Sequence, residues 1–431
     1  MTTQKSVLKH ADNSISVRFG FLGLGMGGSS IAAACAETNT NTTNDRYPYA
    51  SLLINTNKMD LDKIETKNPN TKKLIIADGQ GAARDIATGE KMFVQDLDVI
   101  TKEFKQRFEG SDFVWIVAGL GGGTGTGSVL QAIKMAMTSG FEERFGLILT
   151  LPRTSEGQKI ISNALQRLMK INQAMSGLGS IILVDNEKLF SHFAQKNPNA
   201  PVAEYLTFSN QFVADTLHEM NVVTSSFKPS SEFHFDSSEF RKLIKTPGVL
   251  HFARFSKKAN EIDSAQSISH VGSLKEQIEN GVLSDGYDLN NTKRLAVSVL
   301  ANTNTATRLF NFKFTQELEQ VVNSVAPFAD EKPIAFYKHD NKETSDVFFY
   351  AVFAGLQLPS RVAELVQTNT NLLEQQKQQQ SNNTDIFAGF TLDDEPIENK
   401  TKSFDDLFGD KDESNEKVSS KEAILQALFD K

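Results

Sequence analysis

Gly119-Leu120-Gly121-Gly122-Gly123-Thr124-Gly125-Thr126-Gly127 is the stretch that decides the fold. It follows an apolar run, residues 113–118, that predicts a buried strand, and it precedes residues 128–137, which predict a helix. A strand-to-helix turn leaves backbone N–H groups unpaired at the positive end of the helix dipole, where anions bind. Glycines let the main chain approach a phosphate closely. The stretch therefore predicts a loop that holds a nucleotide by its phosphates.

The same pattern of an apolar strand followed by a polar or glycine turn recurs through the first half of the chain. Glycine turns lie at residues 23–28 and 78–81. Strands alternating with helices in this way indicate a doubly wound α/β fold with a parallel sheet, whose ligands bind at the carboxyl ends of the strands. The expected strands are residues 17–22, 50–55, 74–77, 113–118, 145–151 and 180–184, and residues 92–108 have helical spacing.

The second half predicts a long central helix and a smaller α+β domain. Helical spacing covers residues 203–226, and residues 358–373 predict a closing helix. Between them, residues 251–255, 294–300 and 347–353 predict strands. The predicted organisation is a flexible extension (1–14), a nucleotide-binding domain (15–203), a central helix with its following loop (204–247), a second domain (248–373) and a disordered tail (374–431).

The tail is rich in glutamine, asparagine and charged residues, so it cannot bury a core. Three apolar islands interrupt it, at residues 386–390, 404–408 and 423–429. Such islands either dock onto a partner or are incidental hydrophobic residues in a solvated tail.

Composition narrows the class of protein further. The net charge of -8 argues against a broad DNA-binding surface. One cysteine, Cys35, excludes an internal disulfide framework and fits a reducing compartment. No window reaches the roughly 20 apolar residues of a membrane span. These features predict a cytoplasmic protein that contacts no membrane.

The glycine turns distinguish between classes of nucleotide. Residues 23–28 match G-x-G-x-x-G, which alone suggests a dinucleotide fold. That fold expects an acidic residue at the end of the second strand, where this chain has Asn55-Thr56-Asn57. A G-x-x-x-x-G-K-[ST] motif is absent from the sequence, so no lysine is placed to meet phosphates. Backbone dipoles, threonine hydroxyls and a metal ion, Mg²⁺, are expected to balance the phosphate charge.

Taken together, these segments resemble the tubulin/FtsZ superfamily of GTPases, in the same order along residues 17–370. The resemblance implies a bound GTP or GDP with Mg²⁺. Phosphate contacts are implied for the three glycine turns and Asn55, ribose contacts for Pro152 and Glu156, and guanine contacts for Asn186 and Asn210. The implied phosphate-site residues are Gly23, Gly25, Met26, Gly27, Asn55, Gly81, Ala82, Gly119, Gly121, Gly122, Gly123, Thr124, Gly125, Thr126 and Gly127.

Asparagine suits guanine because its amide donates and accepts hydrogen bonds together. The alternative is that Asn186 and Asn210 only cap a turn or helix. Two positions depart from the family pattern: Ile160 stands where division proteins often have Arg, and Leu206 stands where an aromatic stacks on guanine. Because Tyr205 lies next to Leu206 in the sequence, the residue that stacks on guanine is left open.

The catalytic group is predicted in a separate loop. Residues 234–240 resemble the family loop that enters the neighbouring subunit's nucleotide site, which gives Asp236 and Glu239 the role of positioning the attacking water. The alternative is a helix N-cap with a capping box, which this spacing also satisfies. Both interpretations can hold together.

Segments 19–28, 150–153 and 246–250 resemble the TubZ group of this superfamily. That resemblance implies a head-to-tail filament that segregates plasmid or phage DNA and treadmills. It also implies a TubR-like DNA-binding adaptor, itself bound to a centromere site, that grips the acidic tail, so direct DNA binding is not expected. The alternatives are an FtsZ-like division GTPase and a nucleotide-binding scaffold without turnover.

Overall fold

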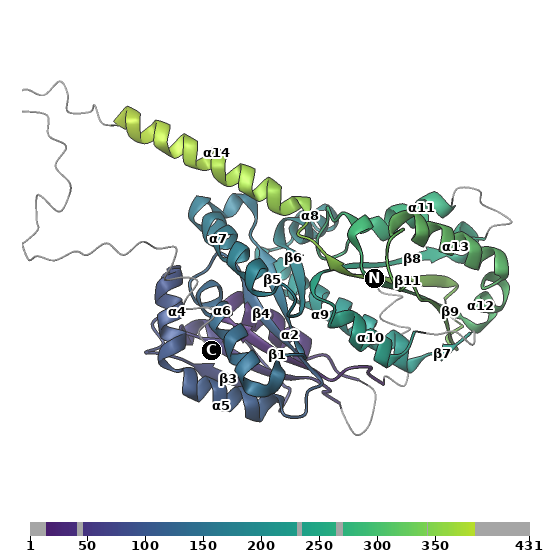
Figure 1. The fold of residues 1–431 in the computed structure, drawn as a ribbon, viewed down its shortest axis with the longest axis horizontal. Helices are drawn as coiled ribbons and strands as arrows, with labels where there is room; N and C mark the ends of the chain where they lie inside the picture. The colour runs from purple at the N-terminus through teal and green to yellow at the C-terminus, as the bar shows by residue number, and fades with distance from the viewer. Residues whose placement is uncertain (1–13, 41–45, 231–234, 264–269, 343, 384–431) are drawn as a thin grey trace, which may run out of the picture. The chain divides into compact units, whose positions relative to one another are not determined.

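A sheet of eleven strands runs through the described residues in the order β3-β2-β1-β4-β5-β6-β8-β11-β9-β10-β7 (Figure 1). The computed structural model describes residues 14–40, 46–230, 235–263, 270–342 and 344–383. The chain divides into two units, residues 1–375 and 376–431, and the sheet belongs to the first. Its strands are β1 (Phe19–Leu24), β2 (Ala50–Asn55), β3 (Thr71–Ile75), β4 (Phe113–Gly119), β5 (Phe145–Leu151), β6 (Ser180–Asp185), β7 (Lys228–Pro229), β8 (Gly248–Lys258), β9 (Arg294–Asn302), β10 (Ile334–His339) and β11 (Asp346–Leu356).

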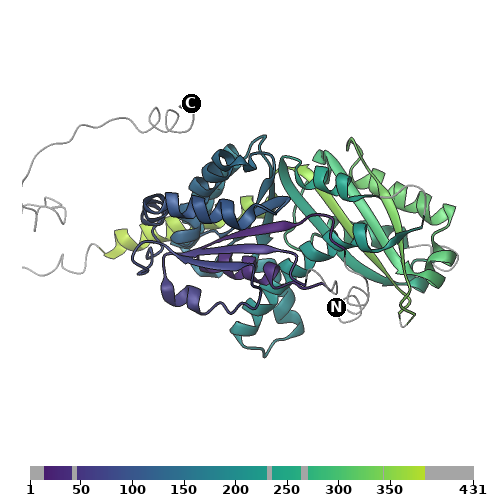
Figure 2. The same cartoon turned by 90° about the horizontal axis from the view of Figure 1, so that it is seen from below.

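Strands β1 to β6 are all parallel, which confirms the predicted doubly wound α/β fold. Figure 2 shows these strands between two layers of helices. The helices of this half are α2 (Gly25–Ala36), α3 (Lys58–Asp62), α4 (Ile86–Gln95), α5 (Leu97–Phe108), α6 (Thr124–Ala136), α7 (Gln158–Ala174) and α8 (Asn186–Lys196).

Alternation along the strands divides the apolar core between the two faces of the sheet. In β4, Val114, Ile116 and Ala118 join one buried cluster. Phe113, Trp115 and Val117 join the other. The first cluster includes side chains from α4 to α7, and the second includes α2 and the long helix α9 (Val202–Ser226). A strand buried on both faces reads as a continuous apolar run, which is how residues 113–118 read in the sequence.

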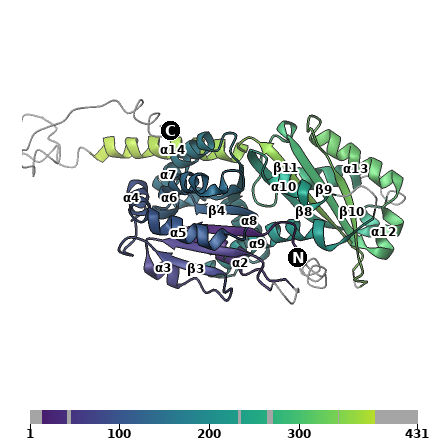
Figure 3. The same cartoon turned by 60° about the horizontal axis from the view of Figure 1, so that its bottom comes forward.

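The second half of the sheet continues directly from the first. Strand β8 pairs parallel with β6, and β11 then pairs antiparallel with both β8 and β9. Figure 3 shows helices α12 and α13 beside β9 and β10. The helices of this half are α10 (Ser237–Ile244), α11 (His270–Glu279), α12 (Thr303–Leu309), α13 (Phe312–Val325) and α14 (Ser360–Asn383).

Two predicted helices have different bounds in the structure. The helical pattern at residues 92–108 is two helices, α4 and α5, which meet at Asp96. The Asp96 carboxylate accepts a hydrogen bond from the Ala77 backbone N–H at 2.6 Å, which stabilises this break. The predicted closing helix ends at Leu373, whereas α14 continues to Asn383, because glutamine, glutamate and lysine are good helix formers.

The domain boundaries at residues 14, 203, 247 and 373 stay predictions. Residues 1–13 of the expected extension and 384–431 of the expected tail, with its three apolar islands, lie outside the described residues. In the described part of the chain, no helix is both long enough and apolar enough to span a membrane.

Candidate functional site

A pocket of about 550 Å³ lies at the carboxyl ends of β1, β2 and β4, where the sequence predicts a ligand. The turns after these strands form it, together with the segment that precedes α4. Its lining contains eleven of the predicted phosphate-site residues. These are Gly25, Met26, Gly27, Asn55, Gly81, Ala82, Gly119, Gly122, Gly123, Thr124 and Gly125.

Two of these glycines bring the first and second phosphate loops into contact. Gly25 has a φ of 68°, and a Cβ on it would lie 2.8 Å from the Gly125 backbone nitrogen. A Cβ on Gly125 would lie 2.7 Å from the Leu24 carbonyl oxygen. Any side chain at either position would therefore separate the loops, so glycine is required for this cradle.

The remaining predicted glycines shape the walls without lining the pocket. A Cβ on Gly127 would lie 2.6 Å from the Ile86 carbonyl oxygen, so this glycine allows α4 to approach α6. Gly23 packs in the same manner against Ser29 in α2. Gly121 has a φ of 110°, and its N–H donates to the Thr126 hydroxyl at 2.8 Å, which fixes the turn from behind.

The side chains in the pocket fit a phosphate ligand. Asn55 is 2% exposed, and its Nδ2 has no hydrogen-bond partner among the described residues. A buried donor without a partner costs free energy, which an incoming acceptor would recover. The hydroxyls of Thr56 and Thr124 lie 2.6 Å apart beside it.

These oxygens also fit a magnesium ion held jointly with phosphates. Among the described residues, no group of three His, Cys, Asp or Glu side chains could hold a metal. Mg²⁺ commonly binds through one or two protein oxygens plus substrate phosphates. Thr56, Thr124 and the lining residue Asp60 offer such oxygens.

The lining also contains residues that were not among the individually predicted contacts: Leu24, Thr56, Asn57, Asp60, Gln80, Ala83 and Arg84. Asn57 caps α3 by accepting from the Asp60 N–H. Arg84 matters most, because no cationic side chain was expected at the phosphates. It is the one arginine or lysine in the lining among the described residues.

Arg84 is held in an unusual backbone conformation. Ala83 and Arg84 have φ angles of 47° and 61°, a region that residues other than glycine seldom adopt. Asn163 Nδ2 donates to the carbonyl oxygens of Arg84 and Gly121, at 3.1 Å and 3.3 Å. This amide therefore ties the strained segment to the main phosphate loop.

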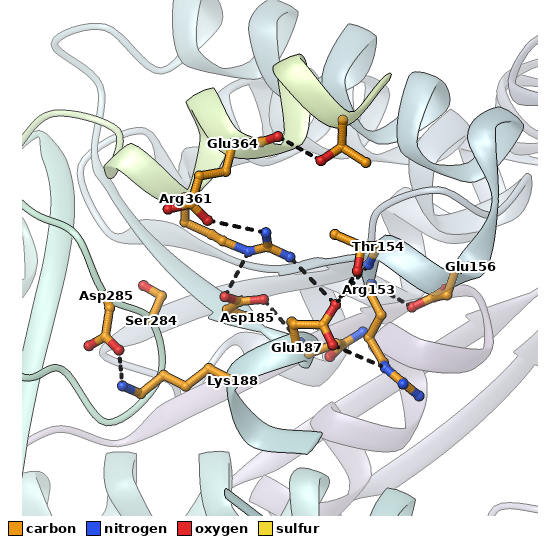
Figure 4. A network of polar contacts seen from close by, with 12 residues as sticks. Arg153, Thr154, Glu156, Asp185, Glu187, Lys188, Ser284, Asp285, Arg361 and Glu364 are labelled. Carbon is orange, nitrogen blue, oxygen red and sulfur yellow. Dashed lines mark hydrogen bonds and ion pairs between the residues drawn. The ribbon is translucent and has the colours of Figure 1, made fainter. Parts of the chain in front are cut away.

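The residues predicted to contact ribose and base do not line this pocket; they lie on neighbouring elements. Pro152 follows β5 and is buried, whereas Glu156 is exposed and accepts from the Arg153 N–H at 2.8 Å. Asn186 is the first residue of α8, and Asn210 lies half-buried on α9. Figure 4 shows the polar contacts around the 153–156 loop and the start of α8.

The stacking position has a clear geometry. Tyr205 is buried, and its hydroxyl donates to the Asn186 carbonyl oxygen at 3.0 Å. Burial raises the pKa of Tyr205 to about 12. Leu206 is 56% exposed. Tyr205 therefore supports the backbone of Asn186, and Leu206 is the residue that faces outward.

Asp236 and Glu239 form the capping box that the sequence allowed. Asp236 Oδ1 accepts from the N–H groups of Ser238 and Glu239, at 2.8 Å and 2.9 Å. Glu239 Oε2 accepts from the Asp236 N–H at 2.9 Å. The N-cap interpretation is confirmed, and the catalytic one stays a prediction.

Comparison with known proteins supports the same class. A family model described as the tubulin/FtsZ GTPase domain matches residues 18–194, and one described as the C-terminal domain of the tubulin-like protein TubZ matches residues 233–360. TubZ of Bacillus cereus is 42% identical over 401 residues, covering 91% of this chain and 92% of that protein.

Solved structures share the fold. A GTPγS-form protofilament of TubZ from Bacillus thuringiensis serovar israelensis has a TM-score of 0.75 at 20% identity, covering 89% of this chain and 99% of the other. A type III plasmid segregation TubZ has a TM-score of 0.69 at 20% identity, covering 87% and 98%.

The parallel sheet, the glycine cradle and the matched domain define a GTP-binding protein of the tubulin/FtsZ GTPase class. The second domain and the identity across nearly the whole chain narrow this assignment. The chain belongs to the TubZ family, and FtsZ proteins are more distant relatives.

Proposed function

We propose that this protein assembles head to tail into filaments, hydrolyses GTP at the contacts between subunits, and segregates plasmid or phage DNA. The observation that supports this proposal best is that the phosphate pocket and the predicted catalytic residues lie far apart within one chain. The phosphate pocket lies at the carboxyl ends of β1 and β4. Asp236 and Glu239 lie at the other end of the same strands.

Contacts of α10 define that other end. Arg241 on this helix donates to the Ser16 carbonyl oxygen at 3.4 Å and to the Asp112 carboxylate at 3.3 Å. Ser16 precedes β1, and Asp112 precedes β4. A strand of six residues spans about 20 Å. One chain therefore cannot bring Asp236 to its own pocket, whereas a second copy stacked end to end can.

The geometry of the α10 N-terminus suits the proposed chemistry. The capping box fixes the carboxyl groups of Asp236 and Glu239 at the start of the helix, one turn apart. A carboxylate held in this way can orient a water and accept its proton. In the pocket, the orphaned Asn55 amide and the backbone of the glycine loop stabilise phosphate charge. Mg²⁺ supplies further charge neutralisation at the phosphates when it is bound.

Head-to-tail contact also explains assembly. A heterologous contact that does not close on itself produces a filament. The protofilament and plasmid segregation descriptions of the two TubZ structures support extending this behaviour to the present chain. Filament growth and GTP hydrolysis are then linked, because each new contact completes one active site.

The partner assignments are part of the same proposal. A TubR-like adaptor on a centromere DNA site would bind the C-terminal tail, in the cytoplasm and without direct DNA or membrane contact by this chain. The acidic sequence of the tail favours binding to a basic adaptor–DNA complex. Deletion after residue 380 is expected to keep polymerisation and abolish adaptor binding, as a co-sedimentation assay would show.

Phosphate release measured against protein concentration tests the central claim. A composite active site predicts a cooperative onset, with negligible specific activity at low concentration. Mixing Asp236→Asn with the pocket variant Gly125→Val should restore activity, because each supplies the half-site that the other lacks. No phosphate release at any concentration would support the non-hydrolysing scaffold. A concentration-independent specific activity would contradict the composite site.

A further inference from the structure

Arg361, at the start of α14, forms a buried ion pair with the end of β6. Its Nε donates to Asp185 Oδ2 at 3.0 Å, and the two side chains are 11% and 7% exposed. Figure 4 shows the guanidinium between Asp185 and a second carboxylate, Glu187, whose Oε2 lies 3.9 Å from the Arg361 NH2 group. One cation therefore pairs with both of these carboxylates, in addition to the exposed Glu364 on its own helix.

Those two carboxylates flank Asn186, the residue predicted to contact guanine. Asp185 caps α8 by accepting from the Glu187 N–H at 3.0 Å. Tyr205 holds the Asn186 carbonyl oxygen from α9. Hydrogen bonds therefore hold the backbone on both sides of Asn186. Arg361 balances the negative charge of the two carboxylates, Asp185 and Glu187, that flank Asn186.

Glu187 extends the same network to the loop predicted to contact ribose. Its Oε2 accepts from the Thr154 N–H at 2.9 Å and from the Thr154 hydroxyl at 2.7 Å. The Arg153 guanidinium lies 3.5 Å above the Phe190 ring in α8 and pairs with Glu187 Oε1 at 3.7 Å. The ribose-side loop and the start of α8 are thus joined through one carboxylate.

The electrostatics explain why the arginine is needed. Burial raises the pKa of Asp185 above its usual value, and the Glu187 charge adds to this, although Arg361 and the Glu187 N–H both lower it. For Glu187, burial raises the pKa, but the Thr154 hydrogen bonds, Arg153 and Arg361 outweigh it, so its pKa lies below the usual value. Without Arg361, two carboxylates on one turn would face each other while partly desolvated.

We propose that Arg361 is a positioning residue for guanine recognition: from α14 it holds the Asn186 turn and the 153–156 loop in the arrangement that contacts base and ribose. This inference rests on the proposed function, which places guanine at Asn186. Because linkage is reciprocal, nucleotide binding must in turn stabilise the first turns of α14.

The test compares full-length Arg361→Gln with wild type in titrations with GTP, GDP and ATP. Arg361→Gln is expected to lower the GTP affinity by at least about tenfold. The ATP affinity should change much less, so the GTP/ATP selectivity should fall. Arg361→Lys, which keeps the charge, should recover part of the loss. Hydrogen exchange at residues 360–366 should slow on GTP binding in wild type and not in Arg361→Gln.

Glu364→Gln is the matched control. Glu364 pairs with Arg361 at 3.4 Å but is 65% exposed, so its loss should leave selectivity within about twofold. If Arg361→Gln fails to fold, Glu187→Gln tests the same link to Thr154.

The outcomes separate this inference from the function it rests on. A folded Arg361→Gln or Glu187→Gln protein with wild-type GTP/ATP selectivity would overturn the inference alone. A wild-type protein that does not prefer GTP to ATP would overturn the proposed function as well.

Discussion

Gly89 on α4 packs directly against Gly123 in the main phosphate loop: a Cβ on Gly89 would lie 2.4 Å from the Gly123 carbonyl oxygen. Gly89→Ala should therefore displace the loop, although alanine normally stabilises a helix interior by about 1 kcal/mol relative to glycine. We expect the affinity for GTP to fall by at least about tenfold. Titration with a fluorescent GTP analogue measures this affinity.

Gly272→Ala is the control for that substitution. Gly272 also lies within a helix, α11, but a Cβ there would meet no atom within 4 Å. The variant should bind GTP normally and be slightly more stable to heat. Equal GTP affinities for the Gly89 and Gly272 variants would show that the close contact does not hold the phosphate loop.

Asp236→Asn separates the structural role of Asp236 from its predicted catalytic role. Asparagine is as good an N-cap as aspartate, so the stability should change by no more than about 0.5 kcal/mol. The lost carboxylate should slow GTP turnover by about 100-fold or more. Phosphate release measures the turnover, and sedimentation measures filament assembly. The variant is expected to assemble into long-lived filaments. Wild-type turnover in this variant would remove Asp236 from the mechanism.

Arg84→Ala should weaken GTP binding more than GDP binding. The Arg84 guanidinium has no hydrogen bond or ion pair among the described residues, so it is available to a ligand. GTP carries more negative charge than GDP and therefore loses more when the cation is removed. We expect about a tenfold loss for GTP by calorimetry. Lys102→Ala, an exposed cation on α5, should have no effect. An equal loss for the two nucleotides would refute a role at the terminal phosphate.

The fold could be predicted from sequence where its signals are local. Apolar runs followed by glycine turns identified the parallel strands, and β2 and β5 have the predicted bounds. Strand β10 was not predicted individually, because its identity depends on pairing with β9 and β7. The break between α4 and α5 depends on a hydrogen bond from Ala77 to Asp96, which helical periodicity does not report.

The same limit applies to the site. Residues at strand ends could be assigned to one pocket, because parallel strands end at the same edge of a sheet. The turn before Arg84 was placed at the phosphates, but the Arg84 side chain was not predicted as a contact, because nothing local indicates that it packs beside Gly123. Arg361 was missed for a stronger reason: 176 residues separate it from Asp185. Only the folded chain brings this cation to the turn at Asn186.

His251 should make the stability depend on pH. It is 1% exposed; its Nε2 bonds to the Ile278 carbonyl oxygen at 2.8 Å, and its Nδ1 has no partner among the described residues. Burial lowers the pKa of His251 from 6.5 to about 4. The unfolded chain therefore binds the extra proton first, and stability is lost as the pH falls from about 6.5 to 4, by up to roughly 3 kcal/mol.

His251→Gln isolates this effect, because glutamine can still donate to Ile278 but cannot gain a proton. His218 and His339 also have pKa values lowered by burial to about 4, so the wild-type decline includes their share. Urea unfolding between pH 7.5 and 4.5 should show a shallower decline for the variant, with the difference between the two proteins developing only below about pH 6.5. A cost is expected because Nδ1 is buried without a hydrogen-bond partner in the part of the chain that the structure describes. Parallel curves for the two proteins would contradict this prediction, because they would show that protonation of His251 does not destabilise the fold.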